Sequence, residues 1–210
     1  MTLARSARLA LVCAFGAAVV ASRAASGPLY EAPAPGSYEL PAIERVQPHA
    51  LVDPAGQSSS FPALAPGQVA VVAFVYRGCH EAQGCPASLA LLRQLDRKLE
   101  ADPARAARVR LASVSFDPTN DTPERMGELR EMMAPKTDWA FLTPGDPAVL
   151  AALLADYGQD ATPLENGSYR HVLKVFLVDD RLRVRNVYSA GLLDPALVIA
   201  DIDTVTSEPR

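Results

Sequence analysis

The chain has 210 residues and a formal net charge of −4, with 49% hydrophobic and 21% charged residues. This length fits one domain plus a leader, and the composition is that of a globular chain rather than a disordered one. The sequence has no block of basic residues, so nucleic-acid binding is disfavoured, because contact with phosphates needs clustered Lys and Arg side chains.

The N-terminus has the pattern of an export signal. Arg5 and Arg8 precede an uncharged, largely apolar run that continues to Arg23, and small residues follow. A basic start, an apolar segment and small residues are typical of a secretory signal. The run is shorter than the roughly 20 residues of a membrane-spanning helix, which makes a retained anchor the weaker alternative for residues 1–26. We therefore expect a periplasmic or cell-envelope protein, exported, with or without an anchor in the inner membrane.

A proline- and alanine-rich segment over residues 27–39 follows the leader. Such a composition is typical of a semi-extended tether. The globular pattern begins near Leu40, and we expect one folded domain over residues 40–206.

The first strong strand signal is the unbroken, valine-rich run at 69–76, which predicts a central strand buried on both faces. Before it, residues 49–61 predict a β-hairpin around a turn at 53–56. Two late strands are adjacent in the sequence, with a turn at Asp179 and Asp180, which indicates an antiparallel pair. The remaining predicted strands, late pair included, cover 109–116, 139–142, 171–178 and 184–188.

Each predicted helix begins at a proline. Proline has no backbone N–H, and at the first helical position this costs nothing, because an N–H there would have no partner within the helix. Leu92, Leu95 and Leu99 form one apolar stripe on the first of these helices. The second helix stops before Pro135, and Gly158 closes the third. The four starting prolines are Pro86, Pro123, Pro147 and Pro195.

Strands that alternate with helices predict a layered α/β fold. We expect a thioredoxin-like central sheet flanked by helices, with an N-terminal β-hairpin and an inserted strand-helix segment.

Two cysteines lie between the first central strand and the first helix. Cys13 belongs to the leader, so the exported protein keeps Cys79 and Cys85, which form a disulfide, a redox couple or part of a metal site. Cys85 directly precedes Pro86, and we expect it at the N-cap. The positive end of the helix dipole favours the thiolate, the form that attacks disulfides and binds soft metals. A purely structural disulfide stays open, although short loops gain least stability from one.

The sequence has three histidines. In a thioredoxin-like sheet, His171 at the start of a late strand lies beside the loop that carries the cysteines. Two thiolates and one imidazole make a soft site that suits copper, whereas structural zinc prefers four protein ligands. We expect His49 on the surface. His80 lies between the cysteines, where it could approach a bound metal, but we interpret it as a solvated loop residue.

Several segments together resemble the Sco/SenC family of copper-binding assembly factors of cytochrome oxidase. The family's F-x-Y-T-x-C-x-x-x-C-P-x-x-L pattern is similar to FVYRGC, HEAQG and CPASL in this chain. The spacing here is C-x5-C, two residues longer than the family's C-x3-C. The other similar segments are SFDPTNDTP at 115–123, WAFLTPG at 139–145, and His171 followed by VLKVFLVDD.

The resemblance implies a thioredoxin-like domain that binds copper through Cys79, Cys85 and His171. It places Asp117 and Asp121 close to the site, where they shape it without binding the metal. The implied partners are an oxidase copper-centre subunit or another copper protein, and a thiol reductant protein.

Three other functions stay open at this point. The main alternative is a thiol-disulfide oxidoreductase that uses Cys79 and Cys85. Such enzymes usually carry C-x-x-C and a proline at the start of the facing strand, where this chain has His171. A peroxidase is disfavoured, because Tyr76 occupies the position where a peroxide-attacking Cys79 needs Thr or Ser. A redox sensor or binding module without copper delivery is the third.

Overall fold

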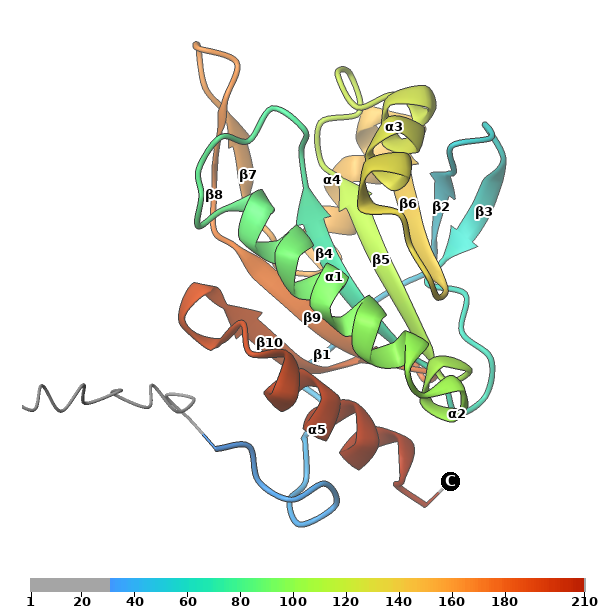
Figure 1. Ribbon diagram of the computed structural model, residues 1–210. Helices are drawn as coiled ribbons and strands as arrows, with labels where there is room; N and C mark the ends of the chain where they lie inside the picture. The colour runs from blue at the N-terminus through green and yellow to red at the C-terminus, as the bar shows by residue number, and fades with distance from the viewer. Residues whose placement is uncertain (1–30, 210) are drawn as a thin grey trace, which may run out of the picture. The chain divides into compact units, whose positions relative to one another are not determined.

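The computed structural model describes residues 31–209, and an eight-stranded mixed sheet runs through their centre (Figure 1). The strand order is β1-β10-β9-β4-β5-β6-β2-β3. The predicted leader over 1–26 and Cys13 lie outside the described residues. The strands of this sheet are β1 (Glu44–Arg45), β2 (His49–Val52), β3 (Ser58–Phe61), β4 (Val69–Val75), β5 (Val109–Ser115), β6 (Trp139–Pro144), β9 (Lys174–Asp179) and β10 (Arg183–Ser189).

The central strand was predicted correctly. Every residue of β4 is buried, as its apolar run requires, because helices cover both faces of the sheet. β4 pairs in parallel with β5 and antiparallel with β9, and β9 pairs antiparallel with β10. The N-terminal hairpin of β2 and β3 also forms, and β2 joins the far edge of the sheet through β6.

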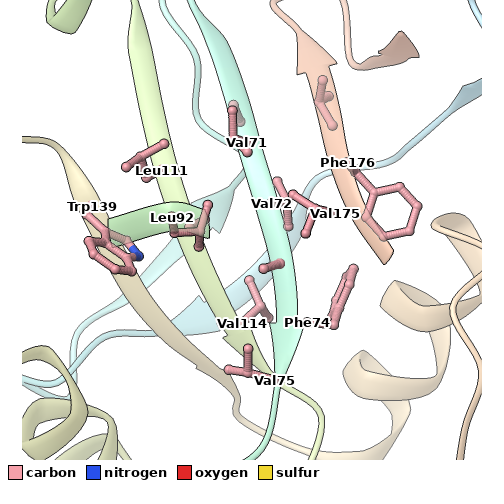
Figure 2. Packing of buried hydrophobic residues seen from close by; sticks show 14 of the residues in the cluster. Val71, Val72, Phe74, Val75, Leu92, Leu111, Val114, Trp139, Val175 and Phe176 are labelled. Atoms are coloured by element: carbon pink, nitrogen blue, oxygen red, sulfur yellow. The ribbon is translucent and has the colours of Figure 1, made fainter. Parts of the chain in front are cut away.

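Helices cover both faces of the sheet, with α1, α3 and α5 in front of it and α4 behind it in Figure 1. Figure 2 shows the rings of Phe74 on β4 and Phe176 on β9 side by side, with centroids 5.8 Å apart. Tyr157, at the end of α4, packs at 5.1 Å from both rings. The helices are α1 (Cys85–Glu100), α2 (Pro103–Ala106), α3 (Pro123–Met133), α4 (Pro147–Asp156) and α5 (Pro195–Thr206), with a 3-10 turn η1 (Ala190–Leu192).

Three of the four predicted helix starts at a proline carry a side-chain cap that the local sequence supplies. The Thr122 hydroxyl accepts a hydrogen bond from the Arg125 N–H, and the carboxylates of Asp146 and Asp194 accept bonds from the first amides of α4 and α5. These caps satisfy amides that have no partner inside the helix. They explain why short local patterns located these helices correctly.

Three expectations about individual residues were wrong. Cys85 is the first residue of α1 and not its N-cap, because the chain already turns at Gly84, whose N–H donates to the Glu81 carbonyl at 2.8 Å. His171 ends a short strand instead of starting a long one. His49 is not a surface residue, because its side chain is 11% exposed and its Nε2 lies 2.8 Å from Asp156.

A second, two-stranded sheet of β7 (Ala161–Pro163) and β8 (Tyr169–His171) accounts for the misplaced histidine. Its residues are exposed or half-buried, so the hairpin has no apolar alternation from which to predict it. His171 pairs with Ala161 across this hairpin, and β9 begins only at Lys174.

The predicted tether is described from residue 31 onward. Gly36 N–H donates to the Thr204 hydroxyl, and the Tyr38 hydroxyl donates to Asp201, so both residues contact α5. Within residues 31–209, no helix has both the length and the apolar character needed to cross a membrane.

Candidate metal centre

The loop after β4 brings the two cysteines together at the start of α1. Cys79 N–H donates to the Tyr76 carbonyl at 3.2 Å, which turns the chain back immediately after the strand. Gly84 makes the return possible, because a Cβ there would lie 3.0 Å from Cys79 Sγ and 3.2 Å from the Glu81 carbonyl oxygen. The loop over residues 80–84 therefore returns close to the Cys79 sulfur and leads directly into α1 at Cys85.

His171 reaches the same point from β8. Its Nε2 lies 3.7 Å from Cys85 Sγ, and the donor atoms of Cys79, Cys85 and His171 all lie within 4.8 Å of one another. Among residues 31–209, this is the one group of three or more His, Cys, Asp or Glu side chains arranged to hold a metal. The structure thus brings the three predicted ligands together, and metal binding by them stays a prediction.

The backbone fixes the orientation of the His171 ring. Its Nδ1 lies 3.2 Å from the Tyr169 carbonyl oxygen, which can only accept a hydrogen bond. We therefore assign the ring proton to Nδ1, which leaves the Nε2 lone pair directed toward the sulfurs. Metal-binding histidines are commonly oriented by such a second hydrogen bond.

Aromatic rings form a wall beside the imidazole. The rings of Tyr76 and Phe116 lie 5.7 and 5.3 Å from the His171 ring, centroid to centroid. Tyr169 packs against both of them, at 5.1 and 5.2 Å. Sequence reasoning missed all three residues as parts of the site. Tyr76 and Phe116 lie inside the segments that resemble the family, whereas the only signal for Tyr169 was its position two residues before His171.

Two acidic residues support the site without joining the three donor atoms. Asp121 accepts hydrogen bonds from the Arg77 N–H at 3.1 Å and from the Ser115 hydroxyl at 2.7 Å, so it ties the start of the cysteine loop to the end of β5. Asp117 accepts a bond from the Tyr169 hydroxyl at 3.1 Å. Burial raises the pKa of Asp121. Burial of Tyr169 and the nearby charge of Asp117 raise the pKa of Tyr169 to about 12.

The pKa of the Cys85 thiol is set by burial more than by its position at the start of a helix. Its side chain is 2% exposed, and this desolvation, together with the neighbouring Cys79, raises the pKa of the Cys85 thiol well above its ordinary range. The expectation of a thiolate favoured by the helix dipole is therefore wrong for the free protein, because loss of hydration outweighs the dipole. A cation bound beside Cys85 would restore the thiolate, with release of a proton.

The other two histidines lie apart from this cluster. His80 is exposed on the loop and is not one of the three converging ligands. His49 pairs with Asp156 near the β2–β3 hairpin. Neither contributes to the candidate site in this structure.

Both the sequence and the fold are similar to those of known proteins. The SCO1/SenC family model matches residues 39–207. Among curated proteins, no sequence matches the chain significantly. Three solved structures illustrate the likeness, and at these identities they show the fold alone.

The first is a SCO1/SenC family lipoprotein from Bacillus anthracis, with 21% identity and a TM-score of 0.69 over 81% of this chain and 100% of that one. The second is BsSco, a member of the Sco family of cytochrome c oxidase assembly proteins in which a disulfide switch was identified. It has 21% identity and a TM-score of 0.67, over 81% of this chain and 99% of that one. The third is Bradyrhizobium japonicum ScoI with copper bound, with 24% identity and a TM-score of 0.59 over 74% of this chain and 97% of that one.

Proposed function

The chain belongs to the SCO1/SenC family, and on that premise we propose that it is an exported copper-binding protein that delivers copper to a cytochrome oxidase copper centre. The alternative form of this role is reduction of that centre's cysteines before loading. The observation that carries the proposal is the convergence of Cys79, Cys85 and His171 within 4.8 Å. Bradyrhizobium japonicum ScoI, which holds copper, and BsSco, an assembly protein, support it by analogy.

The donor set suits copper as a cargo. Thiolate sulfur is a soft ligand that selects Cu(I), and the imidazole also accommodates Cu(II). The cluster offers three donors within residues 31–209, one fewer than structural zinc prefers. A three-coordinate ion also leaves room for an incoming ligand, which transfer by ligand exchange requires.

The chain's own residues prepare this site for uptake and release. The hydrogen bond to the Tyr169 carbonyl keeps the Nε2 lone pair of His171 available. Cys85 loses its proton when the ion enters and regains it when the ion leaves, because burial makes the free thiolate unfavourable. Protonation of the buried sulfur therefore favours release of copper to a partner with better-solvated thiolates.

Metal analysis of the reduced protein tests the proposal. We expect one copper per chain, and we expect His171→Ala to weaken binding by more than about tenfold, because loss of a ligand costs more than loss of an outer hydrogen-bond partner, which commonly costs that factor. Cys79→Ser should abolish tight binding. His80→Ala is the matched control, because His80 is exposed on the same loop and outside the cluster. A His171→Ala protein that binds copper as tightly as the parent would remove His171 from the site.

A thiol-disulfide oxidoreductase is the second candidate, favoured by the close approach of two free cysteines, one of them at a helix start. The raised pKa of Cys85 argues against a ready nucleophile at that position. Reduction of a peptide disulfide at catalytic speed, by copper-free protein, would favour the enzyme. Negligible turnover together with one bound copper would favour the carrier.

Export is proposed from the N-terminal sequence alone. The basic residues and apolar run over 1–26 predict passage into the periplasm, either with cleavage or with retention as a short anchor. Mass measurement of the protein from its host's cell envelope distinguishes the two, since cleavage near residue 25 removes the leader. Recovery of the protein only from the cytoplasm would overturn both.

A further inference from the structure

A groove between α1 and α3 opens onto the cysteines and has no role in the function proposed above. Its cavity volume is about 450 Å³. Cys79 and Cys85 line it, whereas His171 does not, so the groove reaches the sulfurs without passing the imidazole. A molecule seated there would meet both sulfurs while His171 still held the metal from β8.

The groove's surface is mostly apolar. Leu89 and Leu129 lie in its wall, and Met132 and Met133 extend from the last turn of α3. Met132 is 64% exposed, the highest value among the large hydrophobic side chains described. Flexible, polarisable methionine side chains adapt to the shape of a bound peptide, and they are over-represented on surfaces that receive amphipathic segments.

The groove also carries positive charge without acidic residues of its own. Arg77 and Arg93 are its only charged lining residues. Arg77 pairs with Glu128 at 2.8 Å, whereas the structure gives exposed Arg93 no ion pair among residues 31–209. The protein as a whole has a net charge of −4, so this local excess of guanidinium groups favours a negatively charged occupant.

We propose that this groove is the docking site for an acidic, amphipathic peptide segment of the copper-exchange partner, and that this segment carries a soft sulfur ligand. Apolar side chains of the segment cover Met132 and Leu89, its carboxylates pair with Arg93, and its thiol reaches Cys79 and Cys85. The inference rests on the proposed function for the identity of the partner, and it deepens that function by naming the route of transfer.

The transfer step is a ligand exchange in which copper stays Cu(I). A copper–sulfur bond to the incoming thiolate forms as a copper–sulfur bond to Cys79 or Cys85 breaks. The incoming thiol gives its proton to solvent, and the released cysteine takes one up. No oxidant or reductant is consumed.

Two synthetic peptides provide the probe. They share one cysteine and two leucines, and differ only in having three Glu or three Lys residues. Binding of each labelled peptide to the copper-free, reduced protein is measured by fluorescence anisotropy at low salt. We expect the Glu peptide to bind about tenfold more tightly than the Lys peptide, and Arg93→Glu to remove or reverse this preference. Met132→Glu should weaken the Glu peptide by a similar factor, because it opposes both the apolar contact and the charge.

Two surface variants are matched controls. Arg97 lies one turn further along α1, pairs with Glu100 and does not line the groove, so Arg97→Glu should leave peptide binding unchanged. Ile43 is exposed to a similar extent as Met132 but lies beside β1, so Ile43→Glu controls for a surface apolar-to-acidic change. Equal binding of both peptides, or equal effects of Arg93→Glu and Arg97→Glu, would overturn the docking site.

A second readout separates this inference from the function on which it rests. Failure to bind copper at all would refute the proposed copper-carrier function. The preference of the copper-free protein for the Glu peptide over the Lys peptide, measured by anisotropy, would still test the docking site. With Cu(I) loaded, transfer to the Glu peptide should be about tenfold slower for Arg93→Glu at unchanged copper stoichiometry. Glutathione tests for a small anionic thiol: the same dependence on Arg93, without any dependence on Met132, would overturn a peptide occupant. Self-association of the parent that Met132→Glu abolishes would instead assign the groove to a second copy.

Discussion

Substitution of Asp121 tests how the protein holds its cysteine loop. Asp121 is 1% exposed, and its carboxylate accepts hydrogen bonds from the Arg77 N–H and the Ser115 hydroxyl. Asp121→Ala leaves the buried Ser115 hydroxyl and the partly buried Arg77 N–H without this acceptor, at a cost of up to about 1 to 3 kcal/mol each. The desolvation that raises the pKa of Asp121 shows that the native charge is itself unfavourable, and its removal offsets part of this cost. We therefore expect a net loss of about 2 kcal/mol in the free energy of unfolding.

The isosteric change Asp121→Asn isolates the hydrogen bonds from the charge. Its amide oxygen can accept from Arg77, and its NH2 group can donate to Ser115, so we expect a loss below about 1 kcal/mol. Glu128→Ala is the control on the other side of Arg77. Its ion pair with the Arg77 side chain is at the surface, where Glu128 is 62% exposed, and such pairs contribute less than about 1 kcal/mol.

Urea unfolding of the metal-free proteins measures these differences, and copper titration reports whether the loop is still held. We expect Asp121→Ala to weaken copper binding by about tenfold, as loss of an outer hydrogen bond commonly does. The pKa of Asp121 is raised above 3.8, so the folded state binds this proton more tightly than the unfolded chain. The parent should therefore gain stability relative to Asp121→Asn as the pH falls through the raised pKa, and lose it as the pH rises. An Ala variant within about 0.5 kcal/mol of the parent, with unchanged copper affinity, would refute the reasoning.

Three further results are expected. A thiol-alkylating reagent should label Cys79 faster than Cys85, because Cys85 is more deeply buried. The rate of Cys85 labelling should still increase at pH values above 9.0, its ordinary pKa, since burial raises that pKa; equal labelling rates of the two cysteines at neutral pH would contradict this. Asp179→Asn should cost about 2 kcal/mol, because it removes one of the two carboxylates that pair with buried Arg185 and leaves only Glu208. Burial disfavours the charge of Asp179, but its hydrogen bonds with Arg183 and Arg185 outweigh this effect and lower its pKa, so the deficit should shrink in acid; a constant deficit would contradict this. Asp96→Ala should cost about 2 kcal/mol, because the backbone N–H groups of Lys136 and Thr137, after α3, lose the carboxylate to which they donate. Unchanged urea unfolding would show that these N–H groups find other acceptors.

The thioredoxin-like fold followed from patterns that lie within single segments. The all-apolar run of β4 indicates a strand buried on both faces whatever the rest of the chain does. Thr122 before Pro123 forms a cap and a helix start within four residues. The short hairpin of β7 and β8 was missed for the converse reason, since its exposed residues satisfy no hydrophobic period.

The candidate site divides in the same way. Cys79, Cys85 and His171 could be named from the sequence, because residue type and order along the chain carry that information. Phe116 and Gly84 could not, since their part depends on a ring contact and on a close approach to Cys79 Sγ that only folding creates.

By itself, the sequence indicated the residue types of the candidate site, the helix that begins at Cys85 and the central strand before it. The tertiary structure decided where the imidazole approaches, which nitrogen faces the sulfurs and whether Cys85 is charged. These properties depend on groups far apart in the chain: 86 positions separate Cys85 from His171. Desolvation is the sum of everything packed around an atom, so the raised pKa of Cys85 has no counterpart in the helix-start motif that contains it.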